Sequence, residues 1–223
     1  GRITLNAEVR QVRQTADEVR VVWRNTRTGE THEEVADYWQ QVITINGWQK
    51  TRFVERMIRS MFDTIAGKRI AVLGFAFKKD TNDTRESPAI EVCRALLAEQ
   101  AELAIFDPKV TREAILAELQ QATGAGREEL ATRVECPGDP YATIEGAHAL
   151  AVMTEWDQFK ALDFERIYRS MNKPAFAFDG RNVLPHDELR AIGFEVHAIG
   201  KPNAITRWEA TSTEADSRRN EVA

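Results

Sequence analysis

The first third of this chain shows two different spacings of apolar residues, first every second residue and then every third or fourth residue. Between residues 3 and 36 the runs ITLNAEVRQVRQ and EVRVVWRN, with a third short run after the turn TRTGET, show partial period-two alternation, which predicts a small β meander. From residue 37 to 66 apolar residues recur every three or four positions, so we expect one long helix that ends near Gly67. The Asn46-Gly47 pair within it is a candidate break or kink.

After Gly67 short apolar runs alternate with amphipathic segments. The runs are RIAVLGF, ELAIFD, RVEC, HALAVMTEW, PAFAFDG and FEVHAIG. Strands that are apolar throughout and alternate with helices indicate a parallel sheet covered on both faces, so we predict an α/β, doubly wound sheet of about six strands. The chain is thus divided into an atypical β-rich segment (1–36), a linking helix (37–66), a sheet domain (67–207) and a polar tail (208–223) that we expect to be disordered.

Composition excludes several classes of function. The 30 basic and 35 acidic residues give a formal net charge of -5, so we expect neither nucleic acid nor a membrane surface as a partner. Cys93 and Cys136 are far apart in the sequence, and no Cys/His cluster predicts a metal site. With no signal-peptide core and no bilayer-length apolar stretch, we expect a soluble protein of the reducing cytoplasm.

The loop after the first apolar run carries the candidate chemistry. Ligands of open parallel sheets sit outside the carboxyl ends of the strands, and here that end leads into GFAFKKDTNDTRESP. This long charged loop is not the tight G-x-G-x-x-G turn of a dinucleotide site. Ser87 and Pro88 are suited to cap the following helix, whose free N–H groups would favour an anionic ligand.

The segment GKRIAVLGFAFKKDTNDTRES resembles the corresponding loop of UDP-glucose 6-dehydrogenases. The resemblance continues through IFDPKV, DPYATIEGAHALAVMTEWDQFK and PAFAFDGRNVL and covers roughly residues 34–207. It implies that 67–207 is the family's second Rossmann-like domain, which holds the UDP part of a UDP-sugar. It also implies that the preceding helix joins this domain to an NAD domain and supports a homo-oligomer.

The same resemblance assigns four site residues. Phe77 and Lys78 match the family's substrate-binding pair, and Arg181, just after PAFAFDG, matches its second substrate-binding cation. Both cations lie at predicted strand ends, so they could converge on one pyrophosphate. Arg85 matches the arginine that reaches the NAD held by the other domain.

Each assignment has a simpler alternative. A Lys78-Lys79 pair is ordinarily a solvated surface, and only its position and the resemblance favour ligand binding. Arg85 could instead form a salt bridge with Glu86 that orders the loop. Asp107 lies further from Gly74 than a ribose-binding acid usually does, so we expect it to hold a turn or cap.

The family oxidises UDP-glucose to UDP-glucuronate with NAD, through a cysteine nucleophile. The dinucleotide fingerprint and that cysteine belong to segments N-terminal to the matching region, and neither Cys93 nor Cys136 has the nucleophile's sequence context. We therefore predict no catalytic residue here, and no dehydrogenase activity of the chain by itself. The alternative is a non-catalytic UDP-sugar-binding or dimerisation module, and the sugar could also be mannose or an N-acetyl sugar.

Residues 1–36 do not resemble the helices expected before YWQQV. The runs ITLNAEVRQV, EVRVVW and TGETHEEVAD weakly resemble a strand segment of flavin-dependent disulfide oxidoreductases, and an unrelated added hairpin explains them equally well. They contain no FAD-binding loop and no redox CxxC pair, so we infer no flavin.

Overall fold

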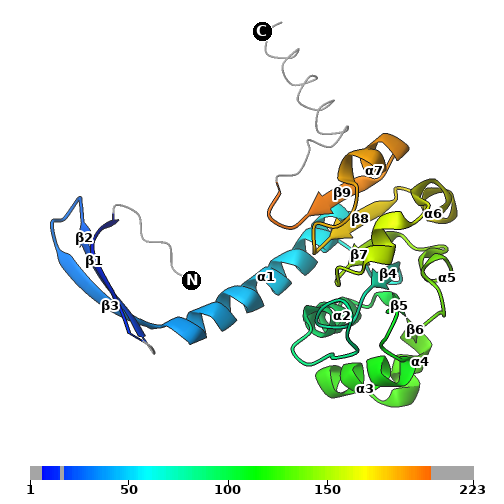
Figure 1. Cartoon of the computed structure of the whole chain (residues 1–223), viewed down its shortest axis with the longest axis horizontal. Coiled ribbons are helices and arrows are strands. Elements are labelled where there is room, and N and C mark those ends of the chain that lie inside the picture. The colour runs from blue at the N-terminus through cyan, green and yellow to red at the C-terminus, as the bar shows by residue number, and fades with distance from the viewer. Residues whose placement is uncertain (1–6, 16–17, 202–223) are drawn as a thin grey trace, which may run out of the picture. The chain divides into compact units, whose positions relative to one another are not determined.

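The computed structural model describes residues 7–15 and 18–201 (Figure 1). They belong to two compact units, and the boundary between the units follows Thr51, inside helix α1 (Tyr38–Ser60). The predicted disordered tail at 208–223 lies outside the described residues.

The first unit contains a three-stranded antiparallel meander, as the alternation predicts. Its order is β1 (Ala7–Gln14), β2 (Glu18–Asn25) and β3 (Thr31–Asp37). The β2–β3 turn forms because the Asn25 side chain accepts from the Arg27 and Thr28 backbone N–H groups, at 2.9 and 3.2 Å, and Gly29 adopts a φ of +78°.

Helix α1 runs without interruption through Asn46-Gly47 but ends at Ser60, earlier than the predicted residue 66. A Cβ at Gly47 would meet no atom within 4 Å, so nothing there forces a break. Phe62 and Asp63 have left-handed φ values of +67° and +57°, which no helix can continue. The periodicity persisted past Ser60 because Ile65 is buried in the core although it lies outside the helix.

The second unit is built on a six-stranded parallel sheet in the order β6-β5-β4-β7-β8-β9, which confirms the doubly wound prediction. Its strands are β4 (Arg69–Leu73), β5 (Glu102–Phe106), β6 (Val134–Glu135), β7 (Ala149–Val152), β8 (Phe176–Asp179) and β9 (Glu195–Ala198). The strand order reverses between β4 and β7, so the loops after these two strands border the usual ligand crevice.

Two groups of helices cover the sheet. The first group is α2 (Pro88–Ala98), α3 (Arg112–Thr123) and α4 (Arg127–Arg133), in which α3 contacts both α2 and α4. The second group is α5 (Pro140–Ile144), α6 (Phe164–Ser170) and α7 (His186–Ile192), with the 3₁₀ helix η1 (Asp157–Ala161) before α6. The pattern did not predict α4, in which only Leu130 is buried.

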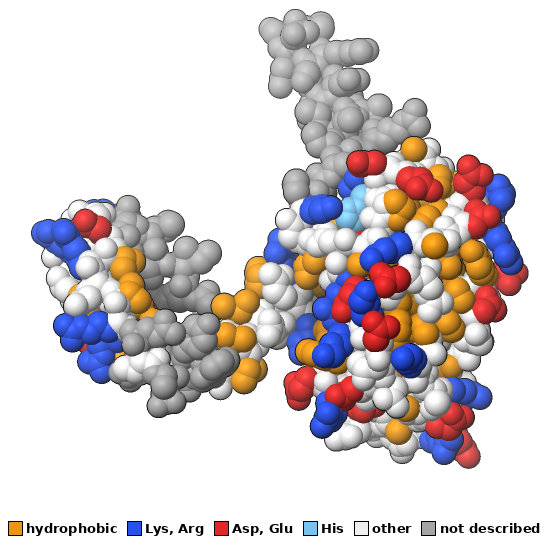
Figure 2. All heavy atoms as spheres, viewed as in Figure 1, with side chains coloured by type: hydrophobic (Ala, Val, Ile, Leu, Met, Phe, Trp, Pro, Cys, Tyr) orange, Lys and Arg blue, Asp and Glu red, His pale blue; other side chains and the backbone are white. Residues whose placement is uncertain are grey.

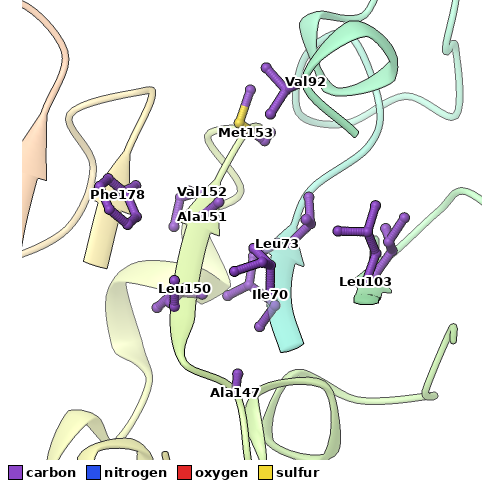
Figure 3. Close-up of a cluster of buried hydrophobic side chains, with 14 of the residues drawn as sticks. Ile70, Leu73, Val92, Leu103, Ala147, Leu150, Ala151, Val152, Met153 and Phe178 are labelled. Carbon is purple, nitrogen blue, oxygen red and sulfur yellow. The ribbon is translucent and has the colours of Figure 1, made fainter. Parts of the chain in front are cut away.

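The core lies between the sheet and these helices. Side chains such as Ile70, Leu73, Leu103, Leu150 and Phe178 meet there (Figure 3), and each is at most 1% exposed. On the face shown in Figure 2, acidic and basic side chains are interspersed over this unit, as the balanced composition predicts. None of the described helices is both long enough and apolar enough to span a bilayer.

Candidate functional site

The candidate site is formed by three loops at the carboxyl ends of β4, β7 and β8. The first loop begins at Gly74, whose φ is +91° and whose N–H donates to the Phe106 carbonyl at 2.8 Å. A Cβ at this position would lie 2.6 Å from Thr154 Oγ1 and 2.7 Å from Thr154 N. Glycine is needed here because the loops after β4 and β7 approach closely.

Asp107 fixes the first turn of this loop from the end of β5. Its Oδ2 accepts from the N–H groups of Phe75 and Ala76, at 2.7 and 3.0 Å, and from Trp156 Nε1 at 3.1 Å. Its Oδ1 accepts from the N–H groups of Lys109 and Val110, at 2.9 and 3.1 Å. The carboxylate is 7% exposed and uses both oxygens, so it holds turns, as predicted, and has no acceptor left for a ribose.

The rest of the loop is closed on itself and on the sheet domain. Phe77 N–H donates to the Asp83 carbonyl at 2.8 Å, and Thr84 Oγ1 donates to Glu118 on α3 at 2.5 Å. Ser87 is the N-cap of α2, where its side chain accepts from Ala89 N–H, and Pro88 is the first helical residue. The predicted cap is confirmed, and the loop reaches α2 in a defined conformation.

Arg181 connects all three loops. Its Nε donates to the Met153 carbonyl after β7 at 2.8 Å, and its Nη2 donates to the Phe77 carbonyl at 3.1 Å. Its Nε also lies 3.4 Å from Oε2 of Glu155. The structure therefore brings the predicted Phe77 and Arg181 together from segments about a hundred residues apart. The sequence does not indicate that Glu155 contacts Arg181, because this contact forms only when the loops after β7 and β8 come together.

The loop that carries Arg181 is itself held by Asp179 at the end of β8. The buried Asp179 accepts from Arg181 N–H with Oδ1, at 2.9 Å. Its Oδ2 accepts from Leu184 N–H at 2.9 Å and lies 2.7 Å from His186 Nε2. The backbone position of Arg181 is thus fixed independently of its guanidinium.

The two lysines of the loop differ in their contacts. Lys79 Nζ donates to Asp157 at 2.7 Å, and this hydrogen bond raises the pKa of Lys79. Lys160 and Lys79 together hold the pKa of Asp157 at about 2. Lys78 is exposed and forms no hydrogen bond or ion pair with any residue of 7–15 or 18–201. Lys78 is therefore the lysine of this loop whose ammonium is not paired within the described residues, and its charge contributes to the lowered pKa of Asp83.

Arg85 forms an ion pair, but its partner is Asp83 and not Glu86 as considered above. Arg85 Nε and Nη2 donate to the two carboxylate oxygens of Asp83 at 2.9 and 2.7 Å. These bonds lower the pKa of Asp83 to about 2. Glu86 adopts a left-handed φ of +58°, and Asp83 presents both oxygens to the guanidinium in a geometry typical of bidentate pairs. The Arg85 side chain is 86% exposed, so its outer edge is open to a ligand.

The cysteines carry no catalytic signature. Burial raises the pKa of the fully buried Cys93 thiol far above its usual range, and burial also raises the pKa of Cys136 to about 11. Both are protonated at neutral pH, which is the opposite of an activated nucleophile. Among the described residues, no group of three or more His, Cys, Asp or Glu side chains could hold a metal ion.

Comparisons with known proteins identify relatives of the second unit. The family model "UDP-glucose/GDP-mannose dehydrogenase family, UDP binding domain" matches residues 71–186. UDP-glucose 6-dehydrogenase 3 of Arabidopsis thaliana is 53% identical in an alignment 184 residues long, which covers 78% of this chain and 38% of that protein. UDP-glucose 6-dehydrogenase 5 of Oryza sativa subsp. japonica is 53% identical in an alignment 178 residues long, which covers 76% of this chain and 37% of that protein.

Solved structures agree on the fold. An NDP-N-acetyl-D-galactosaminuronic acid dehydrogenase from Methanosarcina mazei Go1 matches 69% of this chain and 29% of its own, with a TM-score of 0.54 and 22% identity. A UDP-glucose dehydrogenase from Pyrobaculum islandicum matches 71% of this chain and 31% of its own, with a TM-score of 0.51 and 25% identity. The chain spans less than two fifths of the length of these relatives. Over the part that it spans, it belongs to the UDP-glucose/GDP-mannose dehydrogenase family and contains that family's UDP binding domain.

Proposed function

We propose that the crevice beside Phe77, Lys78 and Arg181 binds the pyrophosphate of a UDP-sugar. The observation that carries this proposal is the Arg181 guanidinium, which ties the loops after β4 and β7 to its own loop after β8. Its Nη1 forms no hydrogen bond with a described residue, and the Lys78 ammonium is equally uncommitted. Two cations that approach one crevice from separate loops match the two charges of a pyrophosphate.

The arrangement also prepares the site before the ligand binds. Arg181 loses little side-chain entropy on binding, because Met153 and Phe77 carbonyls and Glu155 already restrain it. Lys78, by contrast, keeps its rotamer freedom until it meets the ligand. We therefore assign orientation of the pyrophosphate to Arg181 and additional charge neutralisation to Lys78.

We assign UDP-glucose as the sugar nucleotide, because the relatives at 53% identity are named UDP-glucose 6-dehydrogenases. The whole enzyme would oxidise it to UDP-glucuronate in two hydride transfers to NAD, in the cytoplasm. The described residues do not fit as the dinucleotide cradle, because the loop after β4 is long and charged and Asp107 has no free oxygen. Only Arg85 is assigned to the cofactor, as an exposed cation for an NAD held by another domain.

We further propose that the chain forms a homo-oligomer through the first part of α1. Val42, Ile43, Ile45 and Trp48 are between 37% and 64% exposed there. Val42, Ile45 and Trp48 recur every three residues and therefore share one side of the helix, which indicates a surface that another helix covers, and a second copy of α1 supplies the complementary surface.

Calorimetric titration with UDP-glucose tests the binding proposal. We expect Lys78→Ala and Arg181→Ala to weaken binding about tenfold or more each, because each removes a charge-assisted contact to the pyrophosphate. Lys79→Ala is the matched control, since its ammonium is already paired with Asp157. Equal affinities in the wild-type chain and the double variant would refute the site.

An assay of NADH formation separates the enzymatic from the non-catalytic alternative. We expect the chain by itself to form no NADH from UDP-glucose and NAD, because its 223 residues contain no dinucleotide fingerprint. Turnover restored by a separately supplied NAD-binding domain of the family would support the dehydrogenase assignment. Tight UDP-glucose binding without any restored turnover would favour a binding module.

A further inference from the structure

A pocket lies at the same edge of the sheet, at the carboxyl ends of β5 and β6. It has a volume of about 450 Å³ and is lined by the end of β5, the start of α3, residues 136–138 after β6 and Gln158 of η1. None of the residues assigned above to UDP-sugar or NAD lines it. Asp107 stands between the two places, with Oδ2 bound to the loop after β4 and Oδ1 bound to the rim of the pocket.

One part of the wall of this pocket is formed by rings, although polar surface makes up the larger share of the whole lining. Phe106, Pro108 and Pro137 supply these rings, and each is only partly buried. Small-molecule sites are typically concave and about 300–1,000 Å³ in volume, with apolar surface beside polar groups that orient the ligand. Planar rings stack well on phenylalanine and proline surfaces of this kind. The walls therefore fit a flat ring.

Two uncommitted polar side chains complete the pocket. Arg112, the first residue of α3, and Gln158 both line it, and both are exposed without a hydrogen bond or ion pair to any described residue. A guanidinium favours a phosphate or carboxylate, and an amide can donate to and accept from the edge of a heterocycle. The saturated oxygens of Asp107 exclude the ribose-to-carboxylate contact that a dinucleotide domain makes at this strand end.

We propose that this pocket binds a small phosphate-bearing molecule with a flat heterocyclic ring, of the chemical class of a nucleoside monophosphate. Its ring lies against Phe106 and Pro137, and its phosphate pairs with Arg112. The site is separate from the UDP-sugar crevice and does not depend on the function proposed for that crevice.

Cys136 provides a direct reporter, because its thiol lines the pocket. Burial raises its pKa to about 11, so alkylation of the full chain is best followed near pH 9, where about one thiol in a hundred is ionised. Cys93 is fully buried and serves as the internal control, since its alkylation would report unfolding and not ligand release.

We expect adenosine 5′-monophosphate, at several times its Kd, to slow alkylation of Cys136 about fivefold, as measured by peptide mass spectrometry. Adenosine or inorganic phosphate alone should protect less, because each lacks one of the two contacts. Arg112→Ala should abolish the protection. Arg127→Ala is the control: it removes a guanidinium from the first residue of α4, which does not line the pocket, and should leave the protection intact.

Two results would overturn the proposal. One is an unchanged alkylation rate in millimolar adenosine 5′-monophosphate while Cys93 stays unmodified. The other is protection that survives in Arg112→Ala or is lost in the Lys78→Ala, Arg181→Ala double variant, because the nucleotide would then be acting elsewhere. The double variant also separates this test from the proposed UDP-sugar site, whose failure would leave the protection of Cys136 unaffected.

Discussion

At the scale of single residues, Gly74 shows how a steric requirement is distinguished from a functional one. Its left-handed φ and the close Thr154 backbone and side chain leave no room for a Cβ. We expect Gly74→Ala to lower the free energy of unfolding by about 3 kcal/mol, from backbone strain and overpacking together. Gly67→Ala, with a φ of +68° and open space around the Cβ position, should cost only about 1 kcal/mol. Urea denaturation measures both, and equal losses would contradict the steric argument.

The pair formed by Arg85 and Asp83 makes a second residue-scale prediction. Arg85 lowers the folded-state pKa of Asp83 to about 2, so the pair stabilises the folded state. This stabilisation is fully present at pH values above the unfolded-state pKa of Asp83, near 3.8. It is lost as the pH falls from there toward 2. We expect Arg85→Gln to move the Asp83 titration, followed by carboxyl NMR, back toward its ordinary midpoint.

Asp157 provides the reference in the same spectra. Its pKa is also held at about 2, but by Lys160 and Lys79, so the Arg85 substitution should leave its titration unchanged. A shift of both carboxyls would indicate a general change in the loop. No shift of Asp83 would contradict the pairing.

The sequence identified the loops of the candidate site but not the residues that hold these loops together. Phe77, Lys78 and Arg181 could be placed at strand ends, and a family resemblance named them. The turn-holding role predicted for Asp107 is confirmed by its local contacts to Lys109 and Val110. Its contacts to Phe75, Ala76 and Trp156, and the contact of Glu155 with Arg181, could not be predicted, because each joins loops that only the folded sheet brings together. The alternative Arg85–Glu86 pair is replaced by Arg85–Asp83, and the left-handed backbone at Glu86 is not visible in a residue pattern.

At the scale of elements, Asp107 holds the loop after β4 to the loop after β5. We expect Asp107→Ala to leave five buried or partly buried donors without their acceptor and to cost about 3 kcal/mol or more. Asp107→Asn keeps one acceptor oxygen and should cost less. Hydrogen exchange should show faster exchange at Phe75 and Ala76 N–H in the alanine variant, and unchanged protection at both would contradict this role.

Helix boundaries show where sequence patterns stop being informative. The apolar spacing continued to Ile65, yet α1 ends at Ser60, because Lys68 Nζ donates to the Met61 carbonyl at 2.6 Å and the chain then turns through Phe62 and Asp63. The apolar periodicity indicates which side chains are buried, but it does not show whether the backbone that carries them is helical. The short helix α4 was missed for the complementary reason, since one buried residue makes no period.

At the scale of the whole molecule, the sequence predicted a doubly wound parallel sheet of about six strands but not the order of those strands. Apolar runs separated by amphipathic segments, together with right-handed crossovers, leave few arrangements for a parallel sheet. The division into two units after Thr51 could not be predicted, because the apolar spacing predicts one continuous helix across that boundary. The second unit contains the sheet, its core and every proposed site residue.

The two units can be separated experimentally at the boundary after Thr51. A shortened chain that begins at Arg52 retains Phe53, Val54 and Met57, the α1 residues that reach the core, and omits the exposed apolar residues of the first part of α1. We expect it to bind UDP-glucose with the affinity of the full chain but to sediment as a monomer, whereas the full chain self-associates with rising concentration. Replacing Ile45 and Trp48 by serine in the full chain should have the same effect on sedimentation, because it removes apolar area from one side of the helix without shortening it. Self-association that persists in both variants would place the contact on the sheet domain, and weakened binding in the shortened chain would mean that the first unit contributes to the UDP-sugar site.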